Sequence, residues 1–177
     1  KELIEIYDDG SIWLNQDYFN YTTGLRMVFD DKWEKLFGFA RRDSETLLEQ
    51  HHCDLGLAIQ EITEEIVIKM ATDAKKLTGS ENLVMAGGVA LNCVANGKLQ
   101  SAGIFKNIFI QPAAGDAGGA LGAALAAYYI YFNKNRVVDK SLSDAMKGSY
   151  LGPEYSDKDV LQMAKKPSIF SLTWATA

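Results

Sequence analysis

Hydrophobic residues recur through the middle of the chain with the period of an amphipathic helix. From about Asp54 to Gly79 the apolar positions fall on one stripe, and the charged positions lie mostly off it. This pattern predicts one long helix that ends near Gly79, a common helix terminator. The stripe expected to be buried consists of Ile59, Ile62, Ile66, Met70, Ala74 and Leu77.

The pattern before this helix predicts a hairpin and a short helix. Two short apolar runs, residues 3–7 and 11–14, flank the sequence Asp8-Asp9-Gly10. An Asp-Gly turn between strand-forming residues is a strong hairpin signal. A short helix is expected at Lys32–Phe37, with Gly38 ending it.

Beyond the long helix the pattern alternates between short apolar strands and helices. Strands are expected at residues 82–85 and 107–111, and helices at about 90–100 and 117–132. This order, with short connections, predicts a parallel sheet covered by helices, so the fold class is α/β. A final amphipathic helix is expected to begin near Ser156.

Composition and charge narrow the function without naming it. The chain has 47% hydrophobic and 23% charged residues, which is typical of a globular protein. Its net charge of -5, without a basic cluster, does not favour nucleic acid as a partner. Two cysteines without metal-site spacing disfavour a disulfide framework and indicate a cytoplasmic protein. The longest uncharged stretch is shorter than the roughly 20 residues of a membrane span, so no membrane partner is expected.

The sequence LVMAGGVALNCVANGKLQ, residues 83–100, contains the first candidate site. Gly87 and Gly88 follow the first parallel strand at its carboxyl end, where open α/β sheets bind ligands. Residues without Cβ let a ligand approach the backbone, and the N-terminus of the next helix suits phosphate. Asn92 and Asn96, four apart on that helix, could reach the same ligand. The alternative is a tight strand-to-helix turn, with Asn96-Gly97 ending a short helix.

The sequence QPAAGDAGGALGAAL, residues 111–125, contains the second candidate site. It follows the second parallel strand, so it lies at the same edge of the sheet. Asp116 stands among Gly115, Gly118 and Gly119, where its carboxylate could bind a metal ion beside backbone that admits phosphates. The alternative is that Asp116 caps the next helix and that the small residues allow close packing.

In order and spacing, these two loops strongly resemble those of the carbamoyltransferase family that includes the nodulation-factor and antibiotic O-carbamoyltransferases. The segments FNYTTGLRMVF, KLFG, HHCDLGLAIQ and YLGPEYSD are similar to the same family, so the resemblance covers about residues 1–164. It implies a domain similar to the tRNA-threonylcarbamoyl transferase, within the actin/Hsp70/sugar-kinase superfamily. Residues 1–150 would be the C-terminal half of that domain, a parallel-containing mixed sheet with an N-terminal hairpin and flanking helices. Residues 151–177 would link it to a missing second domain, although the tail 167–177 matches no segment of the family.

The resemblance implies that a carbamoyl group, activated as carbamoyl-adenylate from carbamoyl phosphate and ATP, passes to the hydroxyl of a small-molecule acceptor. It implies that Asp116 is one ligand of a divalent metal, commonly iron. The nucleotide-binding residues are expected to be Gly87, Gly88, Val89, Asn92, Gly115 and Gly118.

The family's histidine-rich metal motif is missing from this sequence, which also lacks an initiator methionine. The sequence is therefore expected to be a piece that needs an N-terminal half-domain and a downstream adenylate-forming domain. Alone it is expected to be inactive and, with an apolar face uncovered, to self-associate as a homo-oligomer detectable by light scattering. Two other classes stay open: a nucleotide-binding, kinase-like protein of the same superfamily, and a non-catalytic interaction domain.

Overall fold

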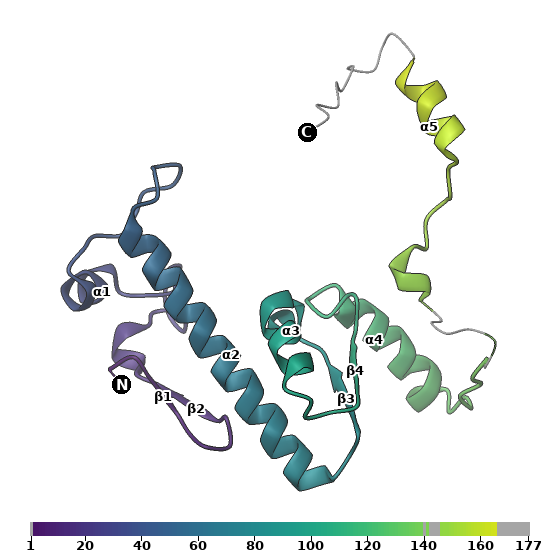
Figure 1. Cartoon of the computed structure of the whole chain (residues 1–177), viewed down its shortest axis with the longest axis horizontal. Coiled ribbons are helices and arrows are strands. Elements are labelled where there is room, and N and C mark those ends of the chain that lie inside the picture. Colours follow the sequence, from purple (N-terminus) through teal and green to yellow (C-terminus); the bar gives the residue numbers. More distant parts are fainter. Residues whose placement is uncertain (1, 140, 142–145, 166–177) are drawn as a thin grey trace. The chain divides into compact units, whose positions relative to one another are not determined.

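A computed structural model describes residues 2–139, 141 and 146–165 of the 177-residue chain. The chain divides into two compact units, residues 1–132 and residues 133–177. Figure 1 shows the order of the elements along the chain. The first unit contains both candidate loops, so the fold is described mainly there.

The first unit begins with the predicted hairpin. Strands β1, Ile4–Ile6, and β2, Ile12–Leu14, pair in antiparallel fashion. The Tyr7 N–H donates to the Ser11 carbonyl at 2.9 Å, and the Asp9 carboxylate accepts from the Ser11 N–H at 2.9 Å. The Asp-Gly signal is thereby confirmed.

Helix α1, Asp30–Phe37, follows a 3₁₀ turn at Gln16–Tyr18. It ends at Gly38 as predicted and begins two residues before the expected start. The Trp33 indole N–H donates to the Tyr18 carbonyl at 3.0 Å, which fastens the helix to the turn.

Helix α2, Gln50–Thr78, is the predicted long helix with an earlier start. His52 belongs to its first turn, where Nδ1 accepts from the Glu49 backbone N–H at 3.0 Å and completes a capping box. The expectation for the buried stripe is wrong for Ile59, Met70 and Leu77, which are exposed. The other three stripe residues are half-buried: Ile62, Ile66 and Ala74. The buried residues of the helix are Glu64, Val67 and Ala71.

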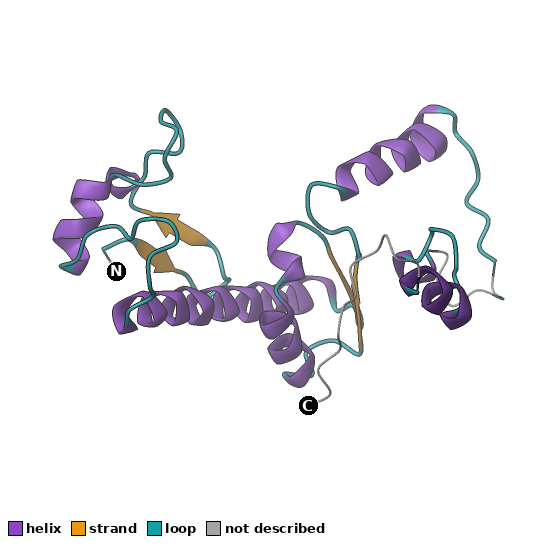
Figure 2. Cartoon of the chain, turned by 90° about the horizontal axis from the view of Figure 1, so that it is seen from above, coloured by secondary structure: helices purple, strands orange, loops and turns teal. Residues whose placement is uncertain are grey.

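Strands β3, Asn82–Met85, and β4, Asn107–Ile110, form the predicted parallel pair. Leu83, Met85 and Ile108 pack toward the core, whereas Val84 and Phe109 are 76% and 53% exposed on the other face. In Figure 2 the strands of this pair and those of the hairpin, both orange, are not joined into one sheet. The described residues therefore form two small sheets and not the single mixed sheet that was expected.

The core of the first unit lies between α2, α3 (Cys93–Ser101) and the parallel pair (Figure 1). Leu99 on α3 is completely buried. Because α2 meets α3 through its Glu64 face, that face is the buried one, and of the predicted stripe Ala74 packs against the core cluster. The buried cluster consists of Val67, Ala71, Ala95, Leu99 and Phe105.

Helix α4, Gly118–Ala126, continues into a π-helical turn at Ala127–Tyr131. Together they confirm the helix expected at 117–132. Neither has a buried residue, and the exposed apolar side chains of this segment are Leu125, Tyr128, Ile130, Tyr131 and Phe132.

The second unit contains a 3₁₀ turn, Lys147–Ser149, and helix α5, Asp157–Ala164. Ser156 caps α5 as predicted, and its hydroxyl accepts from the Asp159 N–H at 3.3 Å. The tail at 167–177 lies outside the described residues. Among the residues described, no helix combines the length and hydrophobicity that crossing a membrane requires.

Candidate functional site

Two glycine-rich loops meet at one edge of the parallel pair. Loop 1, residues 86–92, follows β3, and loop 2, residues 111–119, follows β4. The Gly87 N–H donates to the Ala114 carbonyl at 2.7 Å, which joins the loops directly, and Ala114 is buried. The structure therefore brings the candidate residues of both loops to a shared edge.

Gly87 has a backbone conformation that is essentially restricted to glycine. Its φ is 102° and its ψ is 160°, a region that residues with a Cβ avoid. Gly88 does not have a positive φ. A Cβ added at either position would meet no described atom within 4 Å, so there is open space beside both. Gly87 is required by the turn, whereas the turn does not require Gly88 to be glycine.

The helix expected at 90–100 is divided in two. A 3₁₀ turn, Gly88–Leu91, comes first, and α3 begins at Cys93. Asn92 lies between them with an extended backbone and caps α3, accepting from the Ala95 N–H at 3.1 Å. An asparagine side chain competes with helical hydrogen bonding and favours this capping position. The α3 dipole therefore does not begin directly behind the glycines.

Asn92 and Asn96 do not form the expected pair on one helix face, because Asn92 precedes the helix. The Asn96 Nδ2 donates to the Ala90 carbonyl at 2.8 Å and holds the 3₁₀ turn against α3. Asn96 thus has a structural partner inside the loop.

Asn92 is instead bonded to Gln60 on α2. The Gln60 Nε2 donates to the Asn92 Oδ1 at 3.2 Å, and the Asn92 Nδ2 donates to the Gln60 Oε1 at 2.8 Å. Gln60 Nε2 also donates to Glu64 Oε1 at 2.8 Å, and Lys98 forms an ion pair with Glu64 Oε2. This network connects loop 1, α2 and α3.

Gln60, Glu64 and Lys98 were missed by the sequence-based prediction. Glu64 precedes buried Val67 by three positions and Ala71 by seven, so it lies on the apolar face and needs a partner there. That spacing is a usable signal, but the partner cannot be read from it because Lys98 is 34 positions away.

Glu64 is only 6% exposed and yet stays ionised. Hydrogen bonds from Lys98 and then Gln60 lower the pKa of Glu64 below its ordinary value, and they outweigh desolvation, which raises it. A charged carboxylate therefore ties α2 to α3 at neutral pH.

Replacing Glu64 with glutamine is expected to destabilise the protein at neutral pH and to matter less in acid. Because the folded-state pKa is depressed, the stabilisation by the carboxylate is present above its ordinary value of 4.5 and is lost as the pH falls through the lowered pKa. Denaturant midpoints of wild type and Glu64→Gln, measured from about pH 7 to about pH 3, should converge at the acid end.

Glu61→Gln, at an exposed position on the same helix, is the matched control and should leave the midpoint unchanged across this range. If the difference in denaturant midpoint between wild type and Glu64→Gln stayed constant down to the lowest pH, a role specific to the carboxylate would be contradicted.

Asp116 is exposed in loop 2, one residue before the Ala117 N-cap of α4. Asp116 is therefore not at the N-cap position of α4, which Ala117 occupies without a side-chain hydrogen bond. Within the described part of the chain, no group of three His, Cys, Asp or Glu side chains could hold a metal ion. Asp116 therefore offers at most one ligand, and the described residues alone do not fit a metal.

Gly118 has a packing reason to be glycine. A Cβ at this position would lie 2.2 Å from the Ala113 carbonyl oxygen, a backbone atom that cannot easily move. At Gly115 the added Cβ would lie 3.6 Å from Leu91 Cδ1, which is ordinary contact. The close-packing interpretation of loop 2 thus accounts for Gly118, and Gly115 is not explained in this way.

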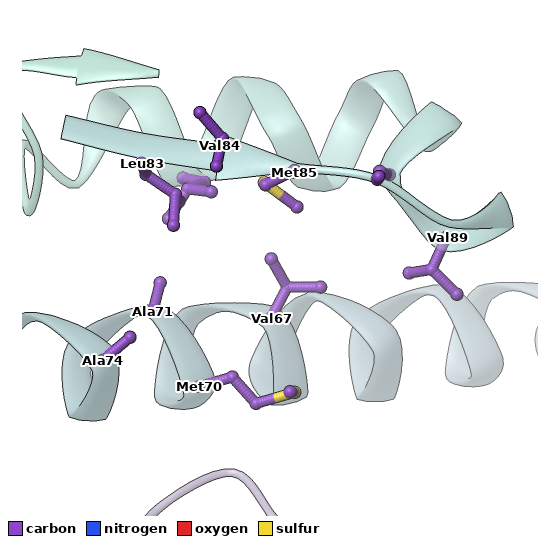
Figure 3. A pocket seen from close by; sticks show the side chains of 11 residues that line it. Val67, Met70, Ala71, Ala74, Leu83, Val84, Met85 and Val89 are labelled. Atoms are coloured by element: carbon purple, nitrogen blue, oxygen red, sulfur yellow. The ribbon is translucent and has the colours of Figure 1, made fainter. Parts of the chain in front are cut away.

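An apolar cavity of about 330 Å³ lies between α2 and β3 (Figure 3). Its lining includes Val67 and Ala71 from α2, Met85 from β3, and Val89 and Ala90 from the 3₁₀ turn. No lining side chain is charged or hydrogen-bonding, so the cavity suits an apolar group. A phosphate would need the backbone of the two loops instead.

Sequence comparisons connect this edge of the sheet to known proteins. The family described as "Carbamoyltransferase N-terminus" matches residues 1–125, which include both loops. The uncharacterized protein sll1178 of Synechocystis sp. is 48% identical over 94% of this chain and 27% of its own length. Nodulation protein NolNO of Sinorhizobium fredii is 43% identical over 64% of this chain and 16% of its own length.

The 3'-hydroxymethylcephem-O-carbamoyltransferase of Streptomyces clavuligerus is 32% identical over 45% of this chain and 15% of its own length. The chain thus spans less than a third of the length of these relatives.

Proposed function

This chain belongs to the carbamoyltransferase family, and from that premise we propose that the protein containing it transfers a carbamoyl group to an acceptor hydroxyl. The observation that carries the proposal is the Gly87–Ala114 hydrogen bond, which joins the two loops on which the family resemblance rests. The name of the Streptomyces clavuligerus relative, an O-carbamoyltransferase, supports transfer to an oxygen atom.

The activated donor in this proposal is carbamoyl-adenylate, made from carbamoyl phosphate and ATP. Water cleaves carbamoyl phosphate to carbamate and inorganic phosphate, and a carbamate oxygen then attacks the α-phosphorus of ATP and expels pyrophosphate. The acceptor oxygen attacks the carbamoyl carbon, the bond from that carbon to the adenylate oxygen breaks, and AMP leaves while the hydroxyl releases its proton. The protein's share is to hold the adenylate in place and to stabilise the negative charge on its phosphate.

Loop 1 is the proposed adenylate site, with Gly115 and Gly118 of loop 2 beside it. Open space next to Gly87 and Gly88 supports close approach of a ligand to the backbone. The first N–H groups of a 3₁₀ turn, here those of Gly88 and Val89, have no partner inside the turn and can meet an anion. The side chain of Val89 is 59% exposed and can contact the ligand.

Asp116 is proposed to contribute one ligand to a divalent metal, iron by analogy with the family. Since the described residues offer no complete metal site, the remaining ligands would come from an N-terminal half-domain outside this sequence. A downstream adenylate-forming domain would supply the activated carbamoyl group.

The proposal is tested by incubating the full-length protein with ATP and carbamoyl phosphate and measuring pyrophosphate release. Release should require both substrates, because adenylate formation expels pyrophosphate from ATP. Thermal-shift measurements with ATP and with carbamoyl phosphate accompany the assay.

Two outcomes would replace the proposal. Phosphoryl transfer from ATP without carbamoyl phosphate would show a kinase-like protein. No stabilisation by ATP and no pyrophosphate release would indicate a non-catalytic domain whose small residues serve packing.

A further inference from the structure

The hydrogen-bonding capacity of the Asn92 amide is nearly used up within the protein. Its Oδ1 accepts from the Ala95 N–H at 3.1 Å and from the Gln60 Nε2 at 3.2 Å, which fills both lone pairs of a carbonyl oxygen. One of its two Nδ2 hydrogens goes to the Gln60 Oε1 at 2.8 Å. What remains at Asn92 is a single N–H donor.

The orientation of Gln60 is itself dictated by charge. Its Nε2 donates to Glu64 Oε1 at 2.8 Å, and an ionised carboxylate can only accept hydrogen bonds. Lys98, which is paired with the other carboxylate oxygen, keeps Glu64 ionised. If the Gln60 amide were reversed, its oxygen would face this carboxylate, so the amide nitrogen is fixed on the Glu64 side.

We propose that Gln60 is a positioning residue that orients the Asn92 amide, so that Asn92 presents an N–H donor to an acceptor atom of the bound nucleotide. This inference rests on the proposed function, because it assigns the ligand of loop 1 to the nucleotide. Each side chain fixes the next: Lys98 keeps Glu64 ionised, and Glu64 orients the Gln60 amide. Gln60 in turn orients the Asn92 amide. The site thereby selects a ligand atom with a lone pair over one that carries hydrogen.

The test compares ATP kinetics of the full-length protein and its Gln60→Ala variant. The KM for ATP should rise about tenfold, as expected for a misplaced hydrogen bond, while kcat changes less than about threefold. Glu61→Ala, at the next and exposed position of α2, is the matched control and should leave both constants unchanged.

A second variant separates positioning from a purely structural role. Asn92→Asp retains a good helix cap and still accepts from the Ala95 N–H and the Gln60 Nε2, but it has no amide hydrogen for the ligand or for the Gln60 Oε1. Its KM for ATP should rise at least as much as that of Gln60→Ala, with kcat changed less than about threefold. Its thermal midpoint should fall, because a carboxylate oxygen then faces the Gln60 Oε1. Combining the two changes should add little, because both remove the same donor.

Hydrogen exchange of residues 86–92 in the nucleotide-free protein gives a readout that does not need activity. Gln60→Ala should exchange faster there than wild type while α2 stays protected. Unchanged exchange would overturn the inference, and so would a loss of kcat that only follows the loss of thermal stability, with no rise in the KM for ATP. If wild type released no pyrophosphate but Gln60→Ala still loosened loop 1, the proposed reaction would fail and the positioning of Asn92 would stand.

Discussion

Asp116→Asn in the full-length protein is expected to lower the rate of carbamoyl transfer by about a hundredfold or more. The substitution keeps the size of the side chain and removes the negative charge that would hold a divalent cation. Because Asp116 is exposed and is not at the N-cap position of α4, the thermal midpoint should hardly change. Turnover and bound metal, the latter by elemental mass spectrometry, should fall together.

Asp31→Asn is the control for this experiment, since Asp31 is also an exposed aspartate and lies in α1 away from both loops. It should keep wild-type turnover and metal content. If Asp116→Asn also kept both, Asp116 would not be a ligand, and loop 2 would be explained by close packing, as Gly118 already is.

The variants Gly87→Ala and Gly88→Ala are expected to have different defects, the first in folding stability and the second in ATP binding. Gly87→Ala forces a Cβ onto a backbone with φ 102° and should cost about 1–3 kcal/mol of folding free energy, with loss of the bond to Ala114. Gly88→Ala should change stability by no more than about 0.5 kcal/mol, because no atom of the described residues lies within 4 Å of the new methyl group. Its KM for ATP should nevertheless rise about tenfold or more, because the methyl group takes ligand space.

Denaturant unfolding and ATP titration of the two variants together separate strain from ligand access. Gly97→Ala is the matched control, because Gly97 lies within α3 with open space around it and a φ that is not positive. It should be stabilising by about 0.5–1 kcal/mol and leave ATP binding alone. A Gly88→Ala variant that bound ATP like wild type would remove loop 1 from the nucleotide site.

Elements with strong local signals could be predicted from the sequence. The hairpin follows from an Asp-Gly turn, β3 from a short apolar run, and α5 from the capping serine at Ser156. In each case the deciding interactions lie within a few residues, so no knowledge of the tertiary partner was needed.

The buried face of α2 could not be predicted in the same way. The helix has apolar residues on several faces, and its hydrophobic period selected one that includes Met70 and Leu77. In the structure, contact with α3 and the parallel pair buries a different face of α2, which is centred on Val67 and Ala71. The hydrophobic period of such a helix shows which residues could be buried. The element that packs against the helix determines which of these residues are buried.

The candidate site was predictable at its edge but not in its interior. Strand order alone brings loops 1 and 2 together, because parallel strands place their carboxyl ends side by side. The break at Asn92 had a readable signal, since asparagine favours helix caps over helix interiors. The pairing of Asn92 with Gln60 joins positions 32 apart, and no local pattern reports it.

The hydrogen bond between Gly87 and Ala114 makes the two loops mechanically one body. Ala114 is only two residues from Asp116, so a displacement of loop 1 by a ligand would be passed to the backbone that carries this carboxylate. If loop 1 holds a nucleotide and Asp116 a cation, occupancy of either position changes affinity at the other, and by an equal factor in both directions. With positive coupling, loop 1 and Asp116 would each bind their ligand more tightly when the other ligand is present than when it is absent.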